Sequence, residues 1–461
     1  MFKHFIVALV LAGVVPLVGT RRLKYYLLAC GVFSIPFSYD ATLFALSTEK
    51  FQGWVSGIII RLSDVFFVLI PLFCRKEAPF GHERPSPFWM DRSSVIFLAM
   101  VFASMLFPSD RKTALVAGFE LALIVSLYYW VTTRYFNWKD DGEYILKCLA
   151  VAVVFQSCLA VWQACFQNGF DFFRTGSAGF LTLQDDYVRT QGTVPQPNGF
   201  ASYLCLTLLP LLAGRLLSKS DRKGILTWSL VLGVVALITT LSRGGWLGLS
   251  VGALYIAWRR LGFRRALRTG LLWGMVLTMV ILALPQVRER LTGDDGGSAQ
   301  DRWYLAQIAL GMIADNPAIG VGINNYRIAM WKYVPKDYEW DLVYRVHTLP
   351  LLIFAEMGVV GLLAFLYLFW RGISLSLGLP PGTRSSSGLI LAGVAAACLA
   401  VLVHGFFDIV WAAPPVTAQF FFILGLGALV RQQIDTNLEG VTLSGHEVMD
   451  ESQELSLTPG S

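Results

Sequence analysis

Long apolar runs, separated by shorter polar segments, follow one another along most of the chain. A helix needs roughly 20 mostly apolar residues to cross a hydrocarbon layer about 30 Å thick. Because backbone groups in lipid must be satisfied internally, such runs predict membrane-spanning helices. We therefore expect an all-α fold, a polytopic transmembrane helix bundle of about 12–13 spans. The runs cover residues 5–19, 25–38, 53–74, 93–108, 114–135, 144–166, 199–217, 225–241, 245–258, 269–286, 348–370, 388–410 and 415–430.

Composition agrees with this pattern. Of 461 residues, 55% are hydrophobic and 15% are charged, and the mean hydropathy of +0.58 is far above that of a soluble chain. The seven cysteines all lie in or at the ends of apolar runs, which gives neither a disulfide framework nor a metal-ligand spacing. The net charge is +6, but five of the arginines fall in one short segment, residues 259–268, which is typical of a topology signal. We expect the lipid bilayer as a partner and no nucleic acid.

The positions of lysine and arginine predict the orientation. Basic linkers lie on the cytoplasmic side of bacterial inner-membrane proteins. The long linkers 167–198 and 287–347 would then face the periplasm, the second of them partly helical. We expect a multi-pass protein of the cell inner membrane whose active site faces the periplasm. The basic linkers are residues 75–92, 218–224, 259–268 and the segment after 370.

The ends of the chain differ from its middle. The first apolar run is followed by Arg21, Arg22 and Lys24 without an Ala-x-Ala-like cleavage site, so we expect a retained helix. Residues 1–431 are expected to form one transmembrane unit. Residues 432–461 are polar and lack helical periodicity, which predicts a disordered cytoplasmic tail.

His347 is the candidate catalytic residue. It stands at the start of a predicted spanning helix, within His347-Thr348-Leu349-Pro350-Leu351. A neutral imidazole there can accept a proton from an incoming hydroxyl near neutral pH. An interfacial histidine that only caps the helix explains the placement equally well, so both interpretations stay open.

Three arginines are candidates for binding a lipid pyrophosphate. Arg243 follows an apolar run and precedes two glycines, and its guanidinium would lie at the depth of a lipid headgroup. Arg302 begins a predicted amphipathic helix, and Arg189 precedes a Pro-rich segment at the start of another span. The alternatives are a snorkelling anchor for Arg243, and an ordinary turn and a plain connector for the segments of the other two.

Ionisable residues within the later spans are expected to be structural. Glu356 would lie about two and a half turns into the helix that follows His347, where a carboxylate is costly unless it is paired. We expect it to give structural support through a buried arginine or polar partner. His404 and Asp408 are one turn apart, and a local polar pair is favoured over a second catalytic dyad.

Four segments, in this order, resemble the O-antigen ligase and O-antigen polymerase superfamily of integral membrane glycosyltransferases. They are the Arg189–Ala201 segment, the Ser242–Gly248 segment, Arg302 with the trailing Asn316-Pro317 and Gly320-Val321-Gly322, and the His347–Gly361 segment. Together they cover roughly residues 185–365. The family usually has asparagine after the histidine, where this chain has Thr348.

The resemblance implies a metal-independent, inverting glycosyltransferase without a cofactor. The donor would be a glycan on undecaprenyl pyrophosphate, with the pyrophosphate held by Arg243, Arg302 and Arg189. His347 would activate the acceptor hydroxyl. The favoured interpretation is an O-antigen ligase that joins O-antigen to lipid A-core during lipopolysaccharide maturation.

Two alternatives remain. A polymerase of O-antigen or exopolysaccharide repeat units would use the same donor on the same side and differ in its acceptor. A membrane transporter would explain the charges within spans, namely Arg61, Asp64, Glu120, Glu356 and Asp408. It is disfavoured because the motifs gather at one face and the chain lacks the paired broken helices of many transporters.

Overall fold

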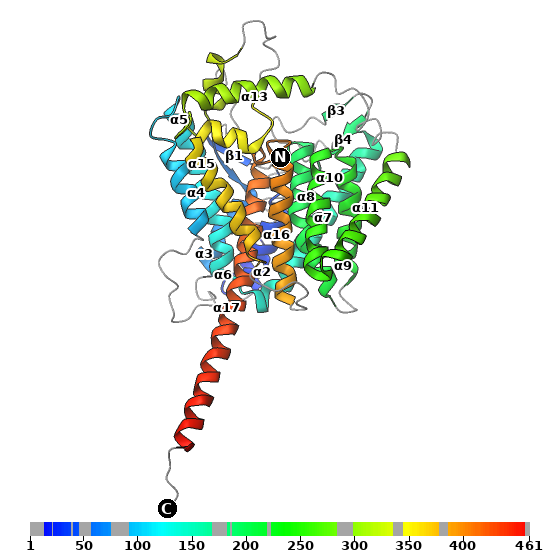
Figure 1. The fold of residues 1–461 in the computed structure, drawn as a ribbon, viewed down its shortest axis with the longest axis vertical. Helices are drawn as coiled ribbons and strands as arrows, with labels where there is room; N and C mark the ends of the chain where they lie inside the picture. Colours follow the sequence, from blue (N-terminus) through cyan, green and yellow to red (C-terminus); the bar gives the residue numbers. More distant parts are fainter. Residues whose placement is uncertain are drawn as a thin grey trace, which may run out of the picture.

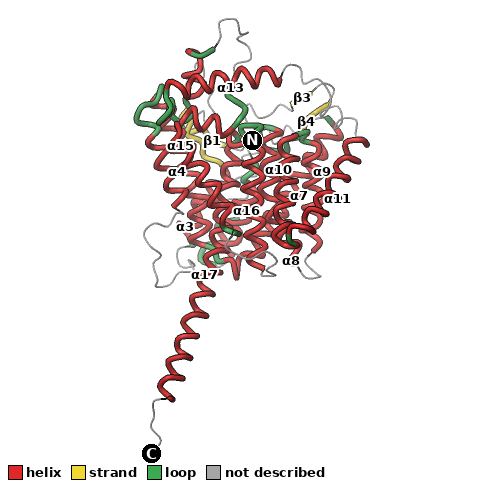
Figure 2. The backbone as a smooth tube through the Cα atoms, viewed as in Figure 1, coloured by secondary structure: helices red, strands yellow, loops and turns green. Residues whose placement is uncertain are grey.

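Helices run up and down one axis, and α13 (Ser298–Asp315) lies across one end of them (Figure 1). We call this the upper end. The computed structural model describes residues 13–20, 22–37, 40–45, 57–74, 92–167, 182–184, 187–218, 223–283, 298–334, 344–377 and 386–456. Helix dominates these residues, as Figure 2 shows. The predicted all-α polytopic bundle is confirmed.

The helices of the bundle coincide with the apolar runs. They are α2 (Arg22–Ser34), α3 (Leu62–Phe73), α4 (Arg92–Ala103), α5 (Arg111–Ile124), the π-helical η3 (Val125–Trp130), α6 (Val131–Tyr135), α7 (Trp138–Phe166), α8 (Pro197–Leu217), α9 (Lys223–Thr239), α10 (Arg243–Leu261), α11 (Phe263–Ala283), α15 (Leu349–Ser374), α16 (Ser386–Gly405) and α17 (Pro414–Ser456). The predicted retained first helix falls mainly on residues outside the described ranges.

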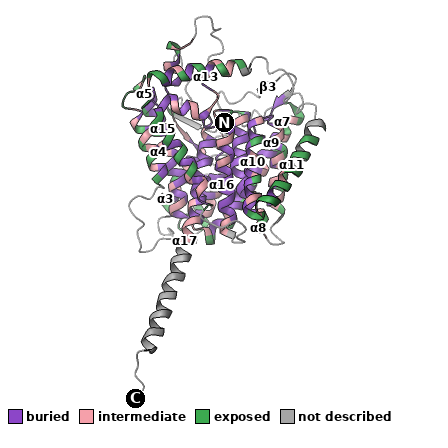
Figure 3. Cartoon of the chain, in the orientation of Figure 1, coloured by how far each residue is buried: buried purple, intermediate pink, exposed green. Residues whose placement is uncertain are grey.

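Six helices among the described residues are long and apolar enough to cross a membrane. The other bundle helices are shorter or less apolar. Apolar side chains on the flank of the bundle remain exposed, for example Leu271, Trp273 and Met279 of α11, whereas buried residues fill the interior (Figure 3). An apolar outer surface is what a helix bundle presents to lipid. The six helices are Arg111–Tyr135, Trp138–Phe166, Pro197–Leu217, Leu349–Ser374, Ser387–Gly405 and Pro414–Asp435.

Part of one predicted span is a strand. The run 53–74 was expected to be helical throughout, but Gly57–Arg61 forms β2 and pairs antiparallel with β1 (Asp40–Ala45). Three consecutive isoleucines favour an extended backbone. The helix begins only after Arg61, whose backbone N–H donates to Asp64 Oδ2 at 2.9 Å. A second short pair joins β3 (Thr182–Gln184) to β4 (Tyr187–Arg189).

α17 also differs from the expected pattern. It continues as a helix to Ser456 and projects beyond the bundle at the end opposite α13 (Figure 1). Residues 436–456 are therefore helical, although their polar sequence predicted an irregular tail. The division of the chain at residue 431 into a membrane unit and a cytoplasmic tail stays a prediction.

Close packing of α10 against α16 fixes the positions of their ends. A Cβ on Gly248 would lie 2.6 Å from the Ala400 carbonyl oxygen, and one on Gly252 would lie 3.0 Å from that of Ala396. Small residues four apart let two helices approach to backbone contact. Because the contacts pair rising with falling residue numbers, the helices are antiparallel, and the start of α10 meets the end of α16.

The loop after α13 packs into a break in α15. Gly358 interrupts that helix with a φ of 67°. The Val321 and Gly322 N–H groups donate to the carbonyl oxygens of Ala355 and Glu356, at 3.0 and 2.8 Å. A Cβ on Gly358 would lie 2.1 Å from the Ala318 carbonyl oxygen, so only glycine fits. The periplasm-assigned segment 287–347 is partly helical as predicted, and its described part is anchored to α15.

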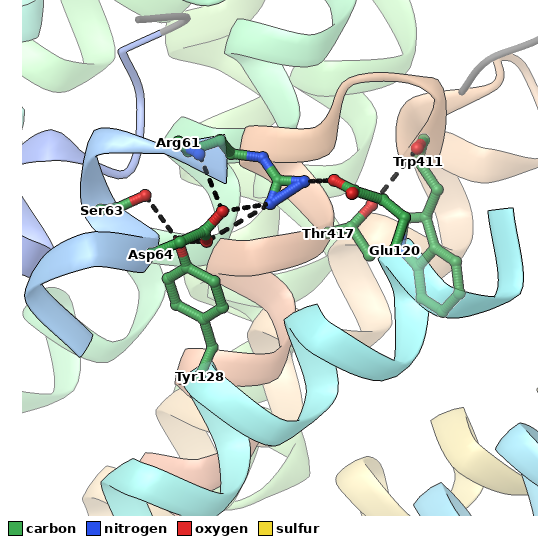
Figure 4. A network of polar contacts seen from close by, with 7 residues as sticks. All are labelled: Arg61, Ser63, Asp64, Glu120, Tyr128, Trp411 and Thr417. Carbon is green, nitrogen blue, oxygen red and sulfur yellow. Dashed lines mark hydrogen bonds and ion pairs between the residues drawn. The ribbon is translucent and has the colours of Figure 1, made fainter. Parts of the chain in front are cut away.

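A buried ion cluster joins α3, α5 and η3 (Figure 4). Arg61 contacts Asp64 with 3.2 Å between Nη1 and Oδ2, and its Nη2 contacts Glu120 Oε1. Tyr128, in the π-helical turn, donates to Asp64 Oδ1 at 2.6 Å. All four residues are nearly inaccessible. Charges at such depth are costly unless paired, and here the arginine lies between two carboxylates.

Candidate active site

His347 lies just before α15 at the upper end of the bundle. Its side chain is 35% exposed, and its Nδ1 is 3.5 Å from Asp408 Oδ1. Asp408 lies in the turn between α16 and α17 and is mostly buried. The separation is longer than a normal hydrogen bond, as catalytic contacts often are before substrate binds. The carboxylate lies where it can orient the imidazole and leave Nε2 free.

A chain of hydrogen bonds continues from Asp408 to Arg189. The Asn198 side-chain amide donates to Asp408 Oδ2, and Arg189 Nη2 donates to Asn198 Oδ1 at 2.7 Å. Arg189 Nε also donates to the Thr240 carbonyl oxygen at 3.0 Å. The network thus connects the start of α8 with the end of α9 and with the turn after α16.

Two glutamines of α7 hold the loop that delivers Arg189 and Asn198. Gln163 Oε1 accepts from the N–H groups of Gln191 and Gly192, at 3.1 and 2.9 Å. Gln156, two turns earlier on the same face, accepts from the Thr193 N–H at 3.0 Å. The loop is therefore a built part of the site and not a plain connector.

The Asp408 carboxyl remains ionised in this setting. Burial alone raises its pKa, but the hydrogen bond and charge of His347, the charge of His404 and the Ile409 N–H lower it by more. The net result is a pKa below the usual value for aspartate. An ionised partner favours the proton on Nδ1 of His347, the tautomer that a general base at Nε2 needs.

His404 has a different role from the one predicted. Its Nδ1 is 2.7 Å from Ser202 Oγ and its Nε2 is 3.2 Å from Ser242 Oγ, so its ring bridges α8 and the start of α10. Asp408 directs its side chain to Asn198 and His347 instead. Among the described residues, His404 and Asp408 share no direct side-chain hydrogen bond, because the ring and the carboxylate contact other residues, although their charges act on each other.

Arg243 is the first residue of α10. Ser242 is the N-cap and accepts from the Gly245 N–H at 3.3 Å. A Cβ on Gly244 would lie 2.5 Å from His404 Cδ2, which makes glycine necessary there. The N-terminus of this 19-residue helix carries partial positive charge and adds to that of Arg243, which is partly exposed. This arrangement is suited to an anion.

Arg302 is partly exposed in the first half of α13, which lies over the same end of the bundle (Figure 1). α13 is fixed by buried Leu305, Ile308 and Met312, which pack with Tyr326 and Val346. The upper end therefore carries Arg189, Arg243, Arg302 and His347, the four residues predicted to take part in binding or catalysis. Arg189 is connected to His347 through Asn198 and Asp408. The role of each in catalysis or binding stays a prediction.

Residues 228–366 match the protein-family model described as O-antigen ligase. This stretch, less than half of the chain, is similar to the O-antigen ligase family. The resemblance inferred from the sequence is therefore confirmed over these residues. Arg243, Arg302, His347 and Glu356 lie inside the matched residues, whereas Arg189 and Asp408 lie outside them.

Other comparisons add little to the O-antigen ligase match. No curated protein matches the chain. A solved structure described as "Structural coordination of polymerization and crosslinking by a peptidoglycan synthase complex" contains a similar chain at 17% identity. The alignment covers 74% of this chain and 96% of that chain, with a TM-score of 0.41.

Glu356, also within the O-antigen ligase domain, lies in the break of α15. It is 1% exposed, and its two carboxylate oxygens accept from the N–H groups of Asn324 and Tyr326, at 2.9 and 3.2 Å. These bonds tie the loop after α13 to the helix that follows His347. Thr348, at the position where the family usually has asparagine, is the N-cap of α15 and makes no side-chain cap hydrogen bond.

Sequence reasoning missed several residues of this candidate site. Asn198 lies within a recognised segment but was not singled out, and Ser202 was not considered. Asp408 was considered as a neighbour of His404 and as a charge within a span, but not as a partner of His347. No local pattern connects Asp408 with His347, because their contact depends on how the turn after α16 packs beside the start of α15.

Proposed function

We propose that the protein transfers a glycan from undecaprenyl pyrophosphate to a sugar hydroxyl at the periplasmic face of the inner membrane. The favoured reaction is O-antigen ligation to lipid A-core. The observation that supports it most is the partly exposed His347, backed by Asp408, at the same end of the bundle as Arg243 and the N-terminus of α10.

In the proposed reaction, the acceptor oxygen attacks the anomeric carbon of the donor while its proton passes to His347 Nε2. The bond from that carbon to the pyrophosphate oxygen breaks, and the pyrophosphate leaves with the electron pair. Attack from the opposite face inverts the anomeric centre. Asp408 stabilises the imidazolium that forms, a role that a fixed carboxylate can fill without accepting the proton.

The leaving pyrophosphate gains charge as the bond breaks, so it needs preorganised positive groups. Arg243 and the α10 N-terminus are assigned this role, together with Arg302 of α13. For Arg189 we favour positioning through Asn198, because two of its guanidinium nitrogens already donate to Asn198 and Thr240. The proposal requires no metal ion, so a chelator should leave transfer by the purified protein unchanged.

Deletion of the gene, scored for glycan length and lipid attachment, tests the assignment to ligation. A ligase predicts long polymer that stays on the carrier lipid and is missing from lipid A-core. Attachment of a single repeat unit would indicate a polymerase instead. Normal, fully attached glycan in the deletion strain would contradict both enzyme functions.

A further inference from the structure

Arg345 lies two residues before His347 and has an unusual environment. Its Nη1 is inaccessible to solvent, and among the described residues it has no hydrogen-bond partner. Arg345 as a whole is partly exposed. Two buried arginines are paired within the chain: Arg61 contacts two carboxylates, and Arg259 donates to the Ser376 carbonyl oxygen at 2.6 Å. A buried guanidinium nitrogen without an acceptor is costly, so it suggests an acceptor that comes from outside the chain.

The backbone at Arg345 is held in place from both sides. Val346 is 1% exposed and packs into the cluster beneath α13. Leu349, at the start of α15, is 2% exposed in the main core. Arg345 and His347 flank the buried Val346, so both belong to a short segment whose position is fixed by apolar contacts. The unpartnered nitrogen is therefore a built feature of this segment.

The nearby carboxylate does not neutralise Arg345 by direct contact. Both oxygens of Glu356 accept backbone N–H groups, from Asn324 and Tyr326. A second guanidinium, Arg327 of α14 (Tyr326–Ala329), is close enough for its charge to act on Arg345. Burial lowers the pKa of Arg345 to about 10, with Glu356 acting to raise it and Arg327 to lower it further. Arg327 thus adds positive charge close to Arg345.

We propose that Arg345, with Arg327 beside it, binds a phosphate group of the substrate next to His347. The inference rests on the proposed transfer function and adds an anion subsite to it. A guanidinium presents parallel N–H donors that match phosphate oxygens, and a second arginine supplies the remaining charge. The phosphate comes either from the donor pyrophosphate or from a phosphorylated sugar of the acceptor.

Binding measurements on the full-length protein in lipid nanodiscs test the subsite. The variants are Arg345→Gln and Arg345→Lys. The matched control is Lys332→Gln, which removes an exposed cation of the same region that is paired with Asp315 at 2.6 Å. The donor probe is farnesyl pyrophosphate. The acceptor probe is a phosphorylated oligosaccharide, compared with its dephosphorylated form.

Arg345→Gln should weaken binding of one probe by about ten- to a hundredfold, and Arg345→Lys should restore it only in part. Loss of farnesyl pyrophosphate binding identifies the donor as the source. Loss of the preference for the phosphorylated acceptor identifies the acceptor. Lys332→Gln should leave both affinities unchanged.

Thermal unfolding without either probe separates binding from a structural role. Because Arg345 Nη1 lacks an acceptor within the described chain, Arg345→Met should keep or raise the unfolding midpoint while it weakens phosphate binding. A lower midpoint with both affinities unchanged would overturn the inference. If the wild type itself bound neither probe and transferred no glycan, the proposed function would fail as well, which the Arg345 variants alone cannot cause.

Discussion

Charged side chains have different surroundings in two regions of the protein. In the cluster between α3, α5 and η3, Arg61 lies between Asp64 and Glu120, and Asp64 also accepts from Tyr128. At the upper end, His347 remains 35% exposed and Arg345 has a nitrogen without an acceptor. Where no ligand arrives, charges must be neutralised within the chain. Where we propose that a ligand binds, part of that capacity is left open.

The largest expected effect is on the buried cluster. Arg61→Met leaves two carboxylates in an apolar interior, and breaking a buried pair typically costs about 3–5 kcal/mol. We expect the variant to lose most of its folded population in detergent, as measured by fluorescence-detected size-exclusion chromatography and thermal unfolding. Arg345→Met is the matched substitution at the open site and should fold normally. Equal stability of the two variants would remove the distinction between the regions.

The next effect concerns the partner of the candidate base. Asp408→Asn keeps the size of the side chain but removes the charge that orients His347. Transfer should fall by about 10²- to 10⁴-fold, with donor binding unchanged, in a single-turnover assay with purified protein. Because the Asn198 amide donates to Asp408, the variant also needs a stability control by thermal unfolding. Full activity in a folded Asp408→Asn protein would rule out the orienting role.

A smaller effect is expected at the start of α10. Gly244→Ala places a methyl group where the nearest atom, His404 Cδ2, is 2.5 Å away, so the first turn of α10 must shift with Arg243. We expect weaker donor binding, by roughly tenfold, and a destabilisation of about 1–3 kcal/mol. Gly224→Ala is the matched control, since nothing lies within 4 Å of the added Cβ. Similar behaviour of both variants would show that the α10 start tolerates displacement.

The smallest effect is the response to acid. The pKa of Asp408 is lower in the folded protein than the value near 3.9 of an unfolded chain. Its ionised form therefore contributes stability above about pH 4 that is lost as the pH falls through the folded-state pKa. The difference in unfolding midpoint between wild type and Asp408→Asn should narrow from about pH 6 to about pH 3. A difference in unfolding midpoint that stayed constant across that pH range would contradict the lowered pKa of Asp408.

The sequence predicts the bundle well because a run of apolar residues of membrane length leaves the backbone few alternatives. It fails at β2, where the high hydropathy belongs to an isoleucine-rich strand. The helix α17 also extends through residues 436–456, where the sequence shows no helical periodicity. Among the candidate residues, His347, Arg243 and Arg302 were found from local patterns at the ends of predicted helices.

The partners of these residues were not predictable in the same way. The roles that we assign to Asp408, Asn198 and Arg345 follow from the packing of separate helices and loops. The local sequence around each residue gives no such signal. The bond from the Asn198 amide to Asp408 depends on the packing of α8 against α16. The bonds that the loop after α13 donates to Glu356 depend on the break at Gly358. These are tertiary features.

Single-turnover transfer by purified His347→Gln protein tests the central claim most directly. Glutamine can hydrogen-bond and cap the helix, but it cannot accept a proton near neutral pH. If His347 is the general base, the variant should fold, bind the lipid-linked donor as the wild type does, and transfer about 10²- to 10⁴-fold more slowly. Transfer at the wild-type rate would contradict the base assignment and leave His347 with a structural role.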